Sequence, residues 1–176
     1  MIFKETRLNG AFQIDLEKIE DQRGFFARTF CRNEFETQEL ETGIAQCNVS
    51  YNTHKGTLRG MHYQVYPHEE AKLVSCLTGA LFDVIVDLRR DSPTFMEWLG
   101  VELDAKTSKV LYIPAGFAHG FETLREDTVV CYKMFEFYHP ECARAIRWDD
   151  TAFSIDWPLP PKIISKKDRS YKDFEI

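Results

Sequence analysis

The feature that most constrains the fold is a succession of short apolar segments, each closed by a turn signal. β-Branched and aromatic residues are frequent in these segments, which are shorter than most helices. They span Lys72–Leu77, Ala80–Leu88, Lys109–Ile113 and Thr128–Tyr138. Thr78-Gly79 separates the first two, and Pro114-Ala115-Gly116 ends the third. Many short strands with turns between them predict a β-sandwich or a β-barrel.

Strand alternation predicts which polar side chains lie together, because neighbouring residues point to opposite faces. In the last segment, four residues would share one face: Tyr132, Met134, Glu136 and Tyr138. His62 and Gln64 would share a face of another strand. If both faces point into one barrel, a histidine, a glutamine and two tyrosine hydroxyls line one cavity. If they point outward, the same side chains are merely solvated, and alternation does not choose between the two.

One short helix is expected from Asn33, which can cap it, with Glu36 three positions later. Phe35 and Leu40 would then face inward.

No repeat, low-complexity tract or linker interrupts the 176 residues, so residues 1–176 are expected to form one domain. No segment is long and apolar enough for a membrane span, and the N-terminus lacks the apolar run of a signal peptide.

The charge balance bears on possible partners. The formal net charge is −6, which argues against nucleic-acid binding, because that requires a basic face. A local cluster of Arg and Lys can still hold a small anionic ligand.

The five cysteines have wide spacings and no C-x-x-C pattern, which is typical of a reduced, cytoplasmic protein. They are Cys31, Cys47, Cys76, Cys131 and Cys142.

The richest polar motif is Thr57–Gln64, which contains Arg59, Gly60 and His62. A histidine with a pKa near about 6.5 is a natural general base at neutral pH. Lys72 follows and could stabilise an oxyanion. Alternatively, His62 is a hydrogen-bonded structural residue and Lys72 a solvated strand end. In the C-terminal segment, Asp168 could orient a histidine, but the sequence alone does not bring it next to His62.

A second motif, Pro114-x-Gly116-x-x-His119, resembles the second motif of the cupins, a superfamily of double-stranded β-helix barrels. The first cupin motif carries His-x-His, and here it reads His62-x-Gln64. An amide is a poor substitute for an imidazole ligand. His62, His119 and Glu70 remain conceivable ligands, but we expect no functional metal.

The chain as a whole resembles the dTDP-4-dehydrorhamnose 3,5-epimerases. The resemblance runs nearly end to end through ordered segments, among them 21–26, 46–48, 58–64, 72–74, 91–95, 114–121, 147–150 and 165–168. It implies an all-β jelly-roll (double-stranded β-helix, cupin-like) fold with short peripheral helices and a homodimer without metal or organic cofactor. It also implies a nucleotide-diphosphate-linked 4-keto-6-deoxy sugar as substrate. The expected reaction is epimerisation at C3 and C5.

The resemblance also implies roles for individual residues. His62 matches the base, Asp168 its partner, Lys72 the lysine near the C4 oxygen, and Tyr132 the proton donor. The remaining matches are substrate-binding residues. Arg23 and Arg59 match residues near the diphosphate, and His119 matches a histidine of the barrel site. Those that line the sugar or nucleoside are Phe26, Gln46, Asn48, Tyr138 and Lys167.

One departure from the family pattern concerns the nucleotide. Arg28 stands where the family commonly has an acidic residue near the nucleobase. It could select a base other than thymine, or it could pair with a local carboxylate such as Glu36.

Three alternative functions stay open: a C3- or C5-only epimerase on a dTDP-, CDP- or GDP-linked sugar, a 3,4-ketoisomerase, and a sugar-binding cupin without chemistry.

Overall fold

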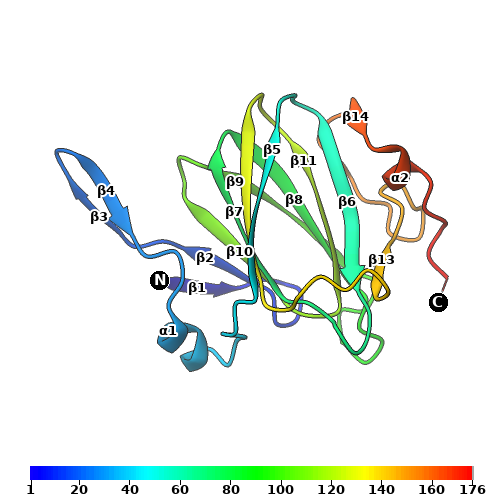
Figure 1. Ribbon diagram of the computed structural model, residues 1–176, viewed down its shortest axis with the longest axis horizontal. Coiled ribbons are helices and arrows are strands. Elements are labelled where there is room, and N and C mark those ends of the chain that lie inside the picture. Colours follow the sequence, from blue (N-terminus) through cyan, green and yellow to red (C-terminus); the bar gives the residue numbers. More distant parts are fainter. Residues whose placement is uncertain (176) are drawn as a thin grey trace.

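The computed structural model describes residues 1–175 and consists mainly of two antiparallel β-sheets that face each other (Figure 1). The first sheet has the order β1-β2-β10-β7-β12-β5. Its strands are β1 (Ile2–Glu5), β2 (Phe12–Asp15), β10 (Lys109–Ile113), β7 (Lys72–Thr78), β12 (Thr128–Met134) and β5 (Gln46–Asn52). The predicted cupin-like, all-β fold is confirmed.

The second sheet has the order β13-β6-β11-β8-β9, and β14 adds to β6 in parallel. Its strands are β13 (Ala143–Ala145), β6 (Thr57–Gln64), β11 (Phe117–Thr123), β8 (Ala80–Asp87), β9 (Trp98–Asp104) and β14 (Ile163–Ile164). Side chains of both sheets meet in one buried cluster, with Val74 and Val130 from the first sheet and Ile85 and Phe121 from the second. This burial supplies the main driving force for closing the barrel.

The predicted tight turn at Thr78-Gly79 joins two strands that do not pair with each other. β7 belongs to the first sheet and β8 to the second, so the chain crosses between sheets here. Gly79 has a φ of +79°, and a Cβ atom at this position would lie 2.4 Å from Oγ1 of Thr128. Glycine is therefore required both by the backbone and by the close approach of β12.

The predicted strand Thr128–Tyr138 is too long, because β12 ends at Met134. Beyond that point, side-chain acceptors take the backbone N–H groups that a ladder would need. The N–H of Phe137 donates to Oε1 of Glu136, and the N–H of Tyr138 donates to Oε1 of Gln46. The expectation that Glu136 and Tyr138 continue the face of Tyr132 by strand alternation is accordingly wrong.

The helix predicted from Asn33 forms as α1 (Arg32–Thr37), but Asn33 lies inside it. The N-cap position is Cys31, which makes no side-chain capping hydrogen bond. Phe35 is fully buried, and Leu40 packs against the same cluster, as predicted. Tertiary packing of Phe35 rather than capping thus determines where the helix lies.

The hairpin of β3 (Lys18–Asp21) and β4 (Gly24–Ala27) projects from the barrel (Figure 1). The large apolar side chains of Ile19, Phe25 and Phe26 are 71%, 54% and 70% exposed on it.

All five cysteines are free, as the sequence predicts. Within residues 1–175, neither helix has the length and apolar character needed to cross a membrane.

The C-terminal segment packs against the outside of the second sheet. Trp157 and Phe153 join the buried cluster that contains Met61 of β6, and β14 then pairs in parallel with the start of β6. The short helix α2 (Lys166–Arg169) follows directly. This segment therefore carries α2 to the side of β6 (Figure 1).

Candidate active site

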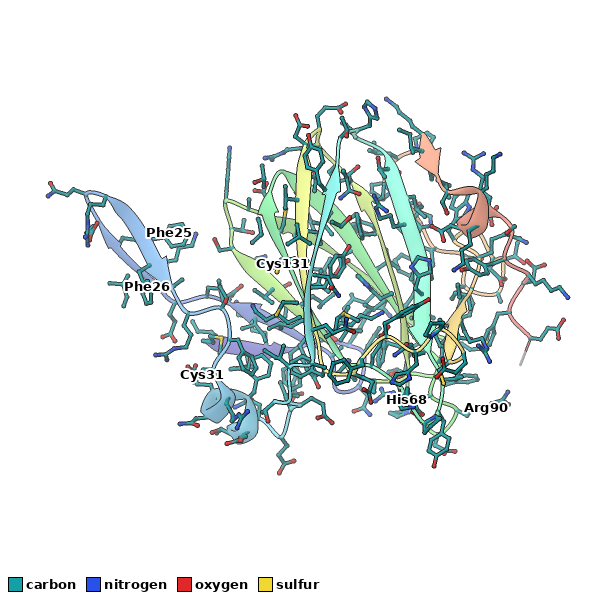
Figure 2. All side chains as sticks on the ribbon, viewed as in Figure 1. Phe25, Phe26, Cys31, His68, Arg90 and Cys131 are labelled. Atoms are coloured by element: carbon teal, nitrogen blue, oxygen red, sulfur yellow. The ribbon has the colours of Figure 1, made fainter. Side chains whose placement is uncertain are left out.

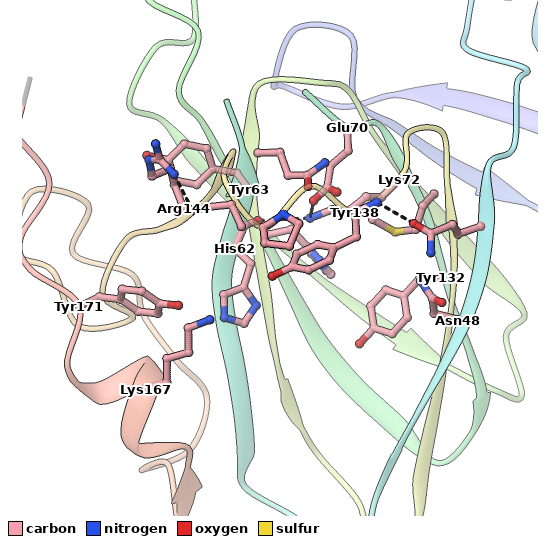
Figure 3. A pocket seen from close by; sticks show the side chains of 16 residues that line it. Asn48, His62, Tyr63, Glu70, Lys72, Tyr132, Tyr138, Arg144, Lys167 and Tyr171 are labelled. Carbon is pink, nitrogen blue, oxygen red and sulfur yellow. Dashed lines mark hydrogen bonds and ion pairs between the residues drawn. The ribbon is translucent and has the colours of Figure 1, made fainter. Parts of the chain in front are cut away.

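A cavity of about 670 Å³ opens between the two sheets, and both contribute side chains to it (Figure 3). This volume lies within the usual range for small-molecule sites, roughly 300–1,000 Å³. Gln46, Asn48, Lys72, Tyr132 and Met134 come from the first sheet. His62 and His119 come from the second sheet, and Tyr138, Lys167 and Tyr171 come from segments outside both.

The first wall is a set of paired residues on three adjacent strands. β12 lies between β5 and β7, so Tyr132 pairs with Asn48, while Met134 pairs with both Gln46 and Lys72. Side chains of directly paired residues point to the same face of a sheet. The register of the three strands therefore presents these five side chains to the cavity together.

The opposite wall depends on an irregularity between β6 and β11. His62 pairs with His119, but Arg59 pairs with Phe121, so the register shifts by one residue between the two pairs. His119 and Phe121 face the same side, and their partners do likewise. In a regular strand Arg59 would face away from His62. The shift brings it to the inner face, where its Nε donates to Oδ1 of Asn52 at 2.8 Å.

His62 forms a dyad with Asp168. Nε2 of His62 lies 2.8 Å from Oδ1 of Asp168, which is only 5% exposed. The hydroxyl oxygen of Ser165 accepts the Asp168 N–H at the start of α2 and fixes the position of the residue. Burial opposes ionisation of Asp168, yet the hydrogen bond with His62, assisted by Ser165 and Gly60, holds the pKa of this carboxyl below its usual value.

Lys72 is a buried cation at the cavity wall. Its side chain is 6% exposed, and Nζ lies 2.7 Å from Oε1 of Glu70. Nζ also donates to the backbone carbonyl of His62 at 3.2 Å. The ammonium is thus fixed close to the dyad, where it can stabilise negative charge that develops on a substrate oxygen.

Tyr132 lies across the cavity from His62, on the first sheet (Figure 3). Burial raises the pKa of its hydroxyl, and the negative charge of Asp83 raises it further. Asp83 is fully buried, and its Oδ1 lies 2.6 Å from Nε2 of His119. The His119 ring in turn packs edge-on against the Tyr132 ring, with centroids 6.0 Å apart. Tyr132 therefore stays protonated at neutral pH, as a proton donor must.

The comparison with known proteins identifies the family. The sequence model of dTDP-4-dehydrorhamnose 3,5-epimerases matches residues 5–175. The chain is 44% identical to the dTDP-4-dehydrorhamnose 3,5-epimerase of Methanothermobacter thermautotrophicus over 173 residues, which are 97% of this chain and 92% of the relative. The chain belongs to the dTDP-4-dehydrorhamnose 3,5-epimerase family. It is accordingly an enzyme of the isomerase class.

Solved structures agree with this assignment. The epimerase from Elizabethkingia anophelis superposes with a TM-score of 0.95 at 40% identity and covers 99% of this chain and 96% of its own. The 3,5-epimerase from Legionella pneumophila, solved with dTDP-4-keto-L-rhamnose, has a TM-score of 0.92 at 38% identity. That alignment covers 98% of this chain and 92% of the Legionella chain. The whole epimerase fold is thus present here.

The structure gathers most of the residues that the family resemblance predicts for the site. Eight of them line the cavity: Gln46, Asn48, His62, Lys72, His119, Tyr132, Tyr138 and Lys167. Asp168 contacts His62 directly, and the charge of Arg59 bears on Tyr132, whose pKa it lowers against the larger effect of burial.

Three predicted substrate residues do not line the cavity: Arg23, Phe26 and Arg59. Arg59 lies on the inner face of β6, where it pairs with Asn52. Phe26 lies on β4 of the projecting hairpin (Figure 2), and Arg23 lies in the turn between β3 and β4. The Arg23 guanidinium forms an ion pair with Asp21 of the same hairpin, and Phe26 is 70% exposed. Arg28 pairs with Glu34 at 3.0 Å rather than with Glu36, so the expected local carboxylate is a different one.

Several residues of the candidate site were not predicted from the sequence. Arg144 and Tyr171 line the cavity, and neither belongs to a motif. Glu70 was considered only as a metal ligand, although its position two residues before Lys72 could have suggested the ion pair. Asp83 interrupts an apolar strand, and a buried carboxylate needs a partner. A carboxylate within an apolar strand could therefore have predicted a basic partner, which the structure shows to be His119.

The three conceivable metal ligands are engaged separately. Each contacts its own charged partner: His62 with Asp168, His119 with Asp83, and Glu70 with Lys72. Gln64, which replaces the second cupin histidine, has a structural role. Its Nε2 donates to the carbonyls of His68 and Phe137. That the reaction needs no metal stays a prediction.

Proposed function

We propose that this protein epimerises a nucleotide-diphosphate-linked 4-keto-6-deoxy sugar at C3 and C5, converting dTDP-4-dehydro-6-deoxyglucose to dTDP-4-dehydrorhamnose. The observation that carries the proposal is the placement of the His62–Asp168 dyad and Tyr132 on opposite walls of one cavity. Inversion at a carbon requires removal of a proton from one face and delivery to the other. The similarity to the 3,5-epimerases supports the substrate class.

His62 is the proposed base. A C4 carbonyl acidifies the hydrogens on C3 and C5, because loss of either proton gives an enolate. His62 takes the proton, and the electron pair of the broken C–H bond passes to the C4 oxygen. Asp168 stabilises the imidazolium that forms, and the Lys72 ammonium stabilises the enolate oxygen.

Tyr132 is the proposed acid. Its hydroxyl delivers a proton to the opposite face of the enolate carbon, and the carbonyl is restored. The tyrosinate and the imidazolium then exchange protons with solvent, so the cycle needs no redox partner. Burial and the charge of Asp83 raise the pKa of the Tyr132 hydroxyl, so Tyr132 is still protonated when the enolate forms.

We further propose that the protein is a cytoplasmic homodimer in which the projecting hairpin reaches a second copy. Arg23 and Phe26 lie outside the cavity of their own chain, and the hairpin exposes large apolar side chains. A hairpin of this kind is marginal alone and gains stability when it packs on another surface. Packing on a partner would bring Arg23 to the diphosphate and Phe26 to the nucleoside of the partner's substrate.

NMR in deuterium oxide tests the reaction. The dTDP-, CDP- and GDP-linked 4-keto-6-deoxyglucoses are offered separately, and deuterium is followed at each sugar carbon. Incorporation at both C3 and C5 of the dTDP sugar is expected. Incorporation at one carbon would indicate a mono-epimerase, and a carbonyl that moves to C3 would indicate a ketoisomerase. No incorporation would indicate a binding protein.

A further inference from the structure

Three side chains with metal-binding groups gather beside the cavity, apart from the dyad and Tyr132. His68 lies in the loop after β6 (Figure 2), and Glu136 and His139 lie in the segment after β12. One ligand atom of each lies within 4.8 Å of the others. Among the residues that the structure describes, no other group of histidine, cysteine or carboxylate side chains meets this criterion.

His68 carries an unsatisfied nitrogen in this group. Its Nδ1 is buried and forms no hydrogen bond within residues 1–175. Oε2 of Glu136 lies 3.5 Å from this nitrogen, within ion-pair range but without a hydrogen bond. Buried polar atoms in native proteins are nearly always paired, so this nitrogen is available to bind a ligand shared with Glu136.

The backbones of both histidines are held by one buried side chain. Nε2 of Gln64 donates to the carbonyl of His68 at 2.9 Å, and Oε1 of Gln64 accepts the N–H of His139 at 2.6 Å. Gln64 is 3% exposed. The separation of the two histidines is therefore set before any ligand arrives, which lowers the entropic cost of binding.

The two imidazole rings are stacked, with centroids 3.4 Å apart and planes 9° from parallel. The in-plane lone pairs of parallel rings do not converge, so a shared ion requires each ring to tilt. The terminal torsion of histidine is broad, and this rotation costs little. Oε1 of Glu141 lies 3.1 Å from Nδ1 of His139 and can orient that ring, as outer carboxylates do for ligating histidines.

We propose that His68, Glu136 and His139 form a binding site for a divalent transition-metal ion of the Zn²⁺ class. Two imidazoles and one carboxylate are a common Zn²⁺ ligand set, with water in the remaining position. Oε1 of Glu136 accepts the Phe137 N–H, and Oε2 is the atom directed at the histidines. The bound ion ties the segment after β12 to the loop after β6.

The site is peripheral to the proposed chemistry but touches the substrate cavity. Tyr138 and Pro140 flank His139 and line the cavity, whereas His62 and Asp168 contact none of the three proposed ligands among the described contacts. Occupancy should therefore change substrate affinity more than the rate of proton transfer. The ion has a positioning role for the segment that carries Tyr138.

Titration calorimetry with ZnCl₂ tests the site on the full chain, expressed without a polyhistidine tag. The wild type should bind one equivalent, and His139→Ala and Glu136→Gln should each weaken binding by at least about tenfold. His54→Ala is the matched control, because His54 faces Glu126 at 3.6 Å in an exposed pair without a third ligand. Melting temperatures without metal check that the variants fold.

The Co²⁺ absorption spectrum separates this site from the cysteines, since thiolate ligands give an intense charge-transfer band that nitrogen and oxygen ligands lack. We expect no such band. A wild type that binds no Zn²⁺ at millimolar concentration would overturn the proposal. So would full Zn²⁺ binding by His139→Ala, which would assign the ion to other groups such as His62 or Cys47.

Discussion

Glu122→Gln is expected to stabilise the protein at alkaline pH. Glu122 lies on β11 and has no exposed surface. Its Oε2 accepts the Leu159 N–H at 3.1 Å, and its Oε1 is buried without a partner among the described residues. Burial raises the pKa of this carboxyl to about 7. The folded protein therefore keeps Glu122 protonated over a pH range in which the unfolded chain has already ionised it.

The magnitude follows from the two pKa values. A folded pKa of about 7 against an ordinary value of 4.5 corresponds to at most about 3 kcal/mol, at about 1.4 kcal/mol per pKa unit. The unfolded chain releases its proton first, so this contribution reduces the free energy of unfolding as the pH rises between the two values. Above the folded pKa the full penalty applies. Glutamine keeps an acceptor for Leu159 and has no proton to lose.

Urea unfolding at about pH 5 and about pH 8 provides the assay. The difference in unfolding free energy between Glu122→Gln and wild type should grow with pH, by up to about 3 kcal/mol. Glu102→Gln is the matched control, because Glu102 is an exposed glutamate on β9, and it should show no such growth. An identical difference at both pH values would mean that Glu122 ionises normally, and the reasoning from burial would be wrong.

The other predictions concern activity. Asp168→Asn should slow deuterium exchange by about tenfold to a hundredfold, because a hydrogen bond to a charged group contributes about 1.5–3 kcal/mol. His62→Ala should slow exchange at both carbons by about a hundredfold to ten-thousandfold, and adding Asp168→Asn to it should slow exchange no further; an additive loss would show that the two residues act independently. Tyr132→Phe should retain proton removal but impair completed inversion, whereas equal loss of both would contradict the assigned roles. Exhaustive chelation should leave turnover at saturating substrate intact, and a loss at saturation that one divalent metal restores would return a metal to the reaction. Arg28→Glu should leave the ratio of the inhibition constants for dTDP and CDP unchanged, because Arg28 pairs with Glu34; a tenfold shift toward dTDP would show that Arg28 reads the base.

Local sequence determined where β7, β8 and β10 lie and where β12 begins. The segment Lys109–Ile113 was predicted with the bounds that the structure has, because Pro114 cannot continue the ladder and an apolar run precedes it. Alternation also placed Tyr132 and Met134 on one face, as the pairing of β12 with β5 confirms. Such features depend on neighbours along the chain, which the sequence displays directly.

The end of β12 and the start of α1 were predicted less well. Residues that favour strands continue past Met134, but the Tyr138 N–H donates to the Gln46 side chain instead of a neighbouring strand, so the ladder ends. Asn33 has the right chemistry for a cap, yet burial of Phe35 sets the helix position. In both places a contact distant in sequence outweighed a local preference, which is worth only about 1 kcal/mol.

The family resemblance supplied the site residues, but only the tertiary structure decided how they meet. His62 and Asp168 are 106 positions apart, and no periodicity links them. Their contact depends on the packing of Trp157 and Phe153 against the second sheet and on the pairing of β14 with β6. Arg59 reaches the inner face only through a register shift. Sequence patterns fix periodicity and turns, whereas sheet pairing and register are set by burial summed over the whole barrel, and that sum exists only in the folded chain.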